Sequence, residues 1–158
     1  MYTSFEKLSD QANIWIYQAD QQLSPTQSKA ILEQAKVFLE SWSSHGRPLL
    51  ASVQIKHDYF LILGIEKADF ELSCCTTDSA IQFLHQVKTS TGVDFLNRGK
   101  IIIKEPNKYS ILSIREAKER LQAETITPDM LTFDNTITQK KELETRWLIP
   151  VKKAWFSK

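Results

Sequence analysis

The chain is poor in several features that mark well-known classes of protein. It has four glycines and two cysteines in 158 residues, and its formal net charge is +1. Two adjacent cysteines exclude a framework of disulfides, and a near-neutral charge disfavours a dedicated nucleic-acid binder. No apolar run approaches the ~20 residues of a membrane-spanning helix, and residues 1–12 lack a signal-peptide apolar region. We therefore expect a cytoplasmic protein with reduced thiols and no membrane contact.

Motifs for common cofactors and metals are also missing. The sequence has no Gly-x-x-x-x-Gly-Lys-Ser/Thr phosphate loop, no Gly-x-Gly-x-x-Gly, no His-Glu-x-x-His and no Cys-x-x-Cys. The histidines His45, His57 and His85 stand at no spacing typical of metal ligands. We predict no metal site and no cofactor, and we expect no ATP hydrolysis.

The clearest predicted element is a helix that begins at Pro25. Ser24 suits the N-cap, proline suits the first helical position, and Gln27 completes a Ser-x-x-Gln capping box. A second helix is expected from Asp78 to Ser90. Apolar residues at helical spacing give the first helix one buried face; they are Ile31, Ala35, Phe38 and Trp42.

Four apolar segments are predicted to be strands. Residues 13–17 and 59–65 are apolar on both faces, which is typical of central strands. Residues 49–56 alternate, and residues 100–104 are three isoleucines between lysines, which favours an edge position for both. The order strand, helix, strand, strand, helix, strand is the ferredoxin-like βαββαβ arrangement. We therefore predict an α+β fold with sheet order 4-1-3-2 and both helices on one face.

Domain organisation follows from where this arrangement ends. Residues 13–105 would form the ferredoxin-like core, residues 1–12 a polar leader, and residues 106–158 a C-terminal α/β extension of the same domain. The extension ends in an aromatic tail that begins at Trp147. Central strands that are apolar on both faces need cover, so we expect this tail to pack on the sheet or to contact a protein partner or a second copy.

The candidate site lies in residues 73–84, where an apolar region gives way to the second helix. Thr76, Thr77 or Asp78 would cap this helix by accepting a backbone N–H. The free N–H groups and partial positive charge of the helix N-terminus would favour the thiolate of Cys75. These residues could therefore bind a small anion or present a reactive thiol.

Two interpretations of this stretch remain open. In the functional one, Cys75 is a nucleophile, Asp78 caps or orients, and His45 reaches in as a base. In the structural one, Cys74 and Cys75 are small core residues and Asp78 is only a cap. The sequence shows no pairing of nucleophile and base, so it does not choose between them.

A second pair of charged residues precedes the last predicted strand. Asp94 and Arg98 are four residues apart, so they could form an ion pair that fixes the link into residues 100–104. Ligand binding by the same pair is the alternative.

Several stretches together resemble a family of small uncharacterised bacterial proteins. They are Ile14-Trp15-Ile16-Tyr17-Gln18, Trp42-Ser43-Ser44-His45-Gly46, Cys75-Thr76-Thr77-Asp78, Val93-Asp94-Phe95-Leu96-Asn97-Arg98 and the run from Trp147 to Pro150. The family pattern Gly-Cys-Ser-Ile-Asp matches here at Cys75 and Asp78, whereas Cys74 replaces the glycine. Members often carry the automatic label of ABC transporter ATPase, which the missing phosphate loop does not support. The resemblance implies no established activity.

Three functions remain to be compared. A non-enzymatic binding or interaction domain is favoured by the near-neutral charge, the missing catalytic motifs and the aromatic tail. A small enzyme or anion-binding protein would use the thiol site at Cys75. RNA binding is least favoured, because Asp58 stands where a stacking aromatic residue is expected in an RNA-recognition strand.

Overall fold

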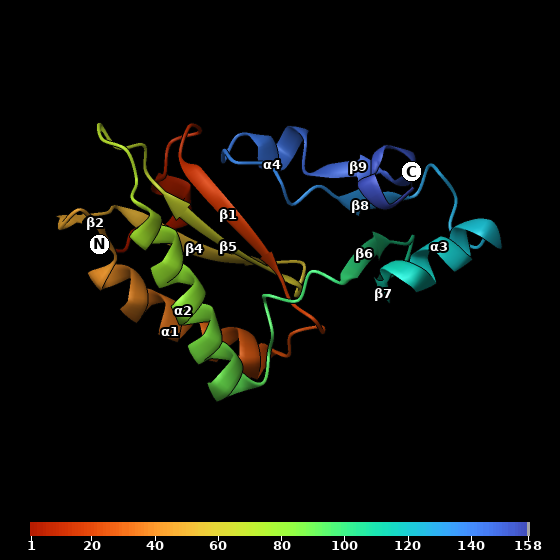
Figure 1. Ribbon diagram of the computed structural model, residues 1–158, viewed down its shortest axis with the longest axis horizontal. Helices are drawn as coiled ribbons and strands as arrows, with labels where there is room; N and C mark the ends of the chain where they lie inside the picture. The colour runs from red at the N-terminus through yellow and green to blue at the C-terminus, as the bar shows by residue number, and fades with distance from the viewer. Residues whose placement is uncertain (158) are drawn as a thin grey trace.

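The structure, a computed structural model, describes residues 1–157 and has an α+β fold. Two larger antiparallel sheets and a two-stranded one make up its β structure. The molecule is elongated, with the N-terminus beside the first sheet and the C-terminus beside the second (Figure 1). None of the helices over residues 1–157 is both long and apolar enough to cross a membrane.

The first sheet has three strands in the order β1-β5-β4. These strands are β1 (Asn13–Gln18), β5 (Phe60–Ile65) and β4 (Ala51–Lys56). All six residues of the central strand β5 are buried. His57 and Asp58 join β4 to β5 with φ of 56° and 61°, so a two-residue turn with left-handed backbone forms here without glycine.

Two helices cover one face of this sheet, α1 (Pro25–Ser41) and α2 (Cys74–Thr91) (Figure 1). The predicted capping box of α1 is confirmed, because the Ser24 Oγ accepts from the Gln27 N–H at 3.1 Å. The shared core is apolar and includes Ile31, Ala35, Leu39, Trp42, Leu61, Leu63, Phe83, Leu84 and Val87. Both predicted helices on one face are therefore present.

The second sheet has four strands in the order β7-β6-β8-β9. They are β7 (Tyr109–Ser113), β6 (Lys100–Lys104), β8 (Leu131–Phe133) and β9 (Leu148–Pro150). One face packs on the first sheet, in a cluster that joins Ile14, Phe60 and Ile62 to Ile102, Ile137 and Trp147. The other face packs with α3 (Ile114–Gln122) and the C-terminal residues, through Ile101, Ile103, Ala117, Val151 and Phe156.

This arrangement corrects the predicted topology. The predicted fourth strand, β6, does not pair with β1, so the sheet order 4-1-3-2 is wrong and the four strands do not form one ferredoxin-like sheet. β1 lies at an edge of the first sheet, whereas β6 is internal in the second. β1 is apolar on both faces although it is an edge strand, because α1 and α2 cover one face and the second sheet covers the other.

Shorter elements complete the structure. The expected polar leader contains the 3-10 helix η1 (Phe5–Lys7), and its Phe5, Leu8 and Ala12 are buried against the first sheet. A small hairpin pairs β2 (Ser43–Ser44) with β3 (Arg47–Pro48). The C-terminal part adds α4 (Glu142–Thr145), η2 (Val151–Lys153) and η3 (Trp155–Ser157).

Candidate functional site

The start of α2 differs from the prediction. The helix begins at Cys74, four residues before Asp78, and Ser73 is its N-cap residue. Asp78 is therefore an exposed residue inside the helix and not a cap. Cys74 and Cys75 are free and exposed, so their interpretation as core residues is wrong.

Thr76 has a structural role at this helix start. It is 1% exposed, and its carbonyl accepts a hydrogen bond from the Trp42 Nε1–H at 3.0 Å. Its Oγ1 lies 3.2 Å from the Ser73 Oγ, and the Ser73 N–H donates to the Ser44 Oγ at 2.9 Å. These bonds tie the start of α2 to the end of α1 and to β2, which leaves Thr76 unavailable to a ligand.

His45, Cys75 and Asp78 do not form a hydrogen-bonded group in the described residues. His45 lies in the β2–β3 turn with φ of 53° and is exposed, as are Cys75 and Asp78. No hydrogen bond joins any two of the three side chains over residues 1–157. Over the same residues, no cluster of three or more histidine, cysteine or acidic side chains could hold a metal ion. A reactive thiol at Cys75 stays a prediction.

The structure also separates Asp94 from Arg98. The Asp94 Oδ2 forms an ion pair with the Lys88 Nζ at 3.4 Å, and its Oδ1 accepts from the Leu96 N–H at 2.8 Å. The Asp94 N–H donates to the Asp20 Oδ1 at 3.1 Å. Asp94 thus fixes the loop after α2, while Arg98 lines a cleft.

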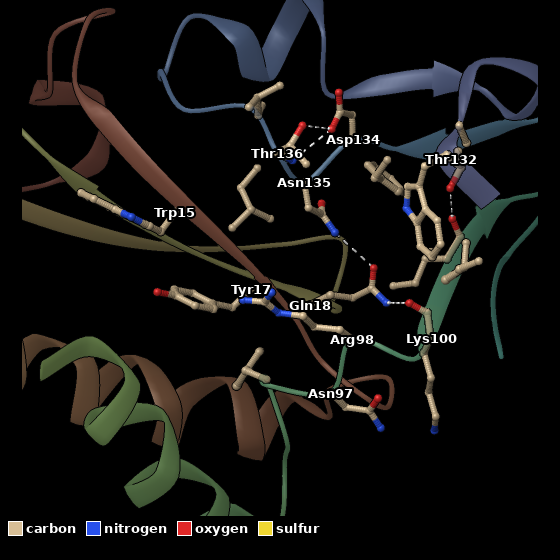
Figure 2. Close-up of a pocket in the computed structure, with 18 of the residues that line it drawn as sticks. Trp15, Tyr17, Gln18, Asn97, Arg98, Lys100, Thr132, Asp134, Asn135 and Thr136 are labelled. Atoms are coloured by element: carbon tan, nitrogen blue, oxygen red, sulfur yellow. Dashed lines mark hydrogen bonds between the residues drawn. The ribbon is translucent and has the colours of Figure 1, made fainter. Parts of the chain in front are cut away.

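This cleft, of about 760 Å³, lies between β1 and the second sheet (Figure 2). β1, the loop at residues 95–98 and β6 line one part of it, and residues 132–138 and 153–156 line another, with Thr77 and Ile81 of α2 and Ile149 of β9 completing the wall. Apolar residues form much of the wall, including Ile14, Ile16, Phe95, Ile102 and Ile137. Of the predicted site residues, Thr77 and Arg98 are in the lining.

The charged side chains of the cleft are mainly cationic. Arg98, Lys100 and Lys153 line it, against a single carboxylate at Asp134. The Lys100 Nζ donates to the Asp20 carbonyl at 3.1 Å, and the Asp134 Oδ1 accepts from the Thr136 N–H at 3.0 Å. Arg98 and Lys153 form no ion pair with residues 1–157, so their charges are available to a ligand.

The electrostatic effect of Arg98 extends to Tyr17, another lining residue. Burial raises the pKa of the Tyr17 phenol, and the positive charge of Arg98 acts in the opposite direction. A positive charge that lowers the pKa of a phenol also favours a bound anion at the same place. The cleft therefore suits an anionic ligand.

Hydrogen bonds of three side chains connect the two sheets at one end of the cleft, and Figure 2 shows those that Gln18 forms with Lys100 and Asn135. The Gln18 amide donates to the Lys100 carbonyl at 2.9 Å and accepts from the Asn135 amide at 3.3 Å. The Asn135 Oδ1 in turn accepts from the Trp147 Nε1–H at 2.9 Å. Gln18 and Asn135 are far apart in the sequence, so this chain of bonds fixes β1 to the second sheet.

Trp155 is the exposed aromatic residue of the cleft. It is 64% exposed although tryptophan is usually largely buried, and its ring meets that of Phe156 edge to face at 6.0 Å. From the sequence, this residue belongs only to the aromatic tail that begins at Trp147. Nothing in the sequence places Trp155, Arg98 and β1 around one cleft, because they come together only through the packing of the two sheets.

Comparison of this chain with models of protein families, with curated proteins and with solved structures found no match. The membership in a bacterial family suggested by the sequence therefore rests on the resemblance alone. The cleft and the start of α2 are the two places in the structure that could bind a ligand or react.

Proposed function

We propose that the protein is a non-enzymatic binding domain whose anionic ligand occupies the cleft between β1 and the second sheet. The observation that carries this proposal is the presence of Arg98 and Lys153, without ion-pair partners in residues 1–157, beside the exposed Trp155. A tryptophan and an arginine at the mouth of a cleft are typical of residues that dominate binding energy.

The composition of the cleft supports binding over catalysis. Its volume falls in the range of about 300–1,000 Å³ that is usual for ligand sites. Its walls are mainly apolar with a few polar groups, which is the usual composition of a binding site. The described lining contains no cysteine, histidine or serine, so it lacks the usual pairing of nucleophile and base.

Calorimetry with a panel of anionic probes tests the proposal. The panel contains dicarboxylates, nucleotides and acidic peptides, each measured with the natural chain and with Arg98→Ala and Lys153→Ala. At least one probe class should bind, and each substitution should weaken it about tenfold, as expected for a lost charged hydrogen bond. Lys118→Ala is the matched control, because Lys118 is exposed on α3 outside the cleft. Binding that is unchanged in both variants would place the ligand elsewhere.

A second candidate function is a thiol or anion site at the start of α2. The exposure of both Cys74 and Cys75 favours it, because a buried thiol could not react in the folded protein. Alkylation of the native protein at pH 7, followed by mass mapping, tests it. Rapid modification of Cys75, slowed by sulfate, would support the site; equal and slow reaction of both thiols would show ordinary surface cysteines.

We also propose that this binding domain works in a bacterial cytoplasm. Two adjacent free cysteines suit a reducing compartment.

A further inference from the structure

We propose that the ligand is an extended acidic peptide segment of a partner protein, which pairs as an added strand with the free edge of β1. This inference rests on the proposed function, because it assigns the chemical class of the ligand in the same cleft. It adds a specific mode of binding, through the main chain of Ile16 and Gln18.

The direction of the backbone groups in β1 follows from its hydrogen bonds. In an antiparallel pair, alternate residues exchange bonds with the partner strand, and the residues between them point to the other side. The Ala19 N–H donates to the Tyr59 carbonyl at 2.7 Å, so the odd-numbered residues face β5. The Ile14 N–H donates outward to the Thr138 carbonyl at 2.9 Å. Ile16 and Gln18 therefore also direct their N–H and C=O groups outward.

Part of this edge is already paired by the chain itself. Residues 138–140 lie antiparallel to residues 12–14, where the Lys140 N–H donates to the Ala12 carbonyl at 3.0 Å. The edge of β1 thus accepts a neighbouring strand without a steric obstacle at its beginning. A peptide bound beyond this point would continue the same edge.

The pairing stops before it reaches Ile16. The Asp134 carboxylate accepts from the N–H and the hydroxyl of Thr136 in a local turn, and residues 134–136 form no backbone hydrogen bond with β1. No backbone group of residues 1–157 bonds to the outward groups of Ile16 or Gln18. Ile16 and Gln18 both line the cleft, so these unpaired groups lie at its border.

The chemistry of the cleft selects the occupant. An added strand gains affinity from main-chain bonds, and pockets for alternate side chains give it specificity. Arg98 and Lys153 would pair with acidic side chains, whereas Trp155 and the apolar wall would contact apolar ones. Four extended residues span about 13 Å, a length that covers the edge from Ile16 to Gln18.

The test uses displayed peptides of about eight residues in which acidic and apolar positions alternate. Peptides selected on the natural chain are measured by fluorescence anisotropy and by amide hydrogen exchange. Saturation should slow exchange of the Ile16 and Gln18 amides about tenfold or more, while the Ile14 amide, already bonded to Thr138, stays unchanged. Methylation of alternate peptide amides should weaken binding about tenfold, because it removes main-chain donors. Arg98→Ala should also weaken it, and Lys118→Ala should not.

Other outcomes overturn the inference in distinguishable ways. If anionic probes bind at Arg98 and Trp155 but the Ile16 and Gln18 amides stay unprotected, the cleft binds a ligand without strand addition. If protection of these amides needs no peptide and depends on protein concentration, the edge pairs with a second copy. If the library gives no peptide that depends on Arg98, the acidic peptide is excluded as the ligand class.

Discussion

The two strands β1 and β6 are alike in composition and opposite in position. Both are short, and both direct apolar side chains to each face of their sheet, although in β1 only Ile14 is fully buried. β1 is nevertheless an edge strand, while β6 has a neighbour on each side. The comparison shows that side chains report what covers a sheet above and below. Side chains do not indicate which strand lies next to a given strand in the sheet, because strands pair through backbone N–H and C=O groups that nearly every residue has.

The largest expected effect comes from removing the neighbours of β6. A chain truncated after Glu105 lacks β7, β8 and β9 and leaves one face of the first sheet uncovered. Each large apolar side chain that loses its burial costs about 1.5–3 kcal/mol of folding free energy. Several such losses together exceed a typical stability of about 5–15 kcal/mol. We expect a molten or insoluble product, measured by near-ultraviolet circular dichroism and dye binding. A well-folded monomeric fragment would show that the second sheet is dispensable.

The contact between the two sheets can be tested at Phe60. Its ring lies 4.6 Å from that of Phe133 and 4.9 Å from that of Trp147, and it is fully buried. Phe60→Ala should destabilise the protein by about 3–5 kcal/mol in urea denaturation. Val37→Ala, on the exposed side of α1, is the control and should have little effect. A small loss at Phe60 would mean that the sheets are only weakly joined.

Proline substitutions sharpen the difference between β1 and β6. At Ile16 the N–H has no backbone partner in residues 1–157, so proline should cost only about 1 kcal/mol more than alanine. At Ile103, which pairs with Ser110 of β7 and with Thr132 of β8, proline removes a ladder bond and should cost about 3 kcal/mol more than alanine. Chemical denaturation of the four variants gives both differences. Equal penalties at the two positions would contradict an open edge at β1.

The smallest expected effect is a pH dependence at His57. Burial, and then the positive charges of Lys56 and Lys104, lower its pKa, with Asp58 opposing them. The unfolded chain therefore binds the proton more tightly, so this group lowers the stability of the fold as pH falls below about 6.5. His57→Asn keeps a residue that tolerates the positive φ of the turn.

The melting temperature of the natural chain should therefore fall more between pH 7 and about pH 5 than that of His57→Asn. An identical fall in both proteins would mean that other groups cause the acid sensitivity.

The sequence predicted those parts of the fold that depend on local chemistry. The capping box at Ser24 forms as expected. A second box of the same type opens α3 at Ser113, and Gly92 ends α2 with φ of 78°. The start of α2 was misplaced, because several polar residues in succession could serve as the N-cap. Backbone conformation places Ser73 there, while its hydroxyl accepts a hydrogen bond from Ser44 in another part of the chain.

The candidate site was predicted less well than the fold. Arg98 was predicted to form an ion pair with Asp94. In the structure Asp94 forms an ion pair with Lys88 instead. The cleft itself depends on contacts between residues more than one hundred positions apart, such as Gln18 and Asn135. No local pattern encodes such contacts, since they arise only when two separately formed sheets pack together.

The bridge from Gln18 through Asn135 to Trp147 also has a consequence for the order of events during synthesis. Translation proceeds from the N-terminus, so β1, β4 and β5 leave the ribosome well before residues 132–156. Asn135, in the opposite wall of the cleft, follows Gln18 by 117 residues and is therefore synthesised much later. A nascent chain would therefore expose the β1 edge before it could recognise a ligand, and selective binding would begin only after residues 132–156 have been synthesised.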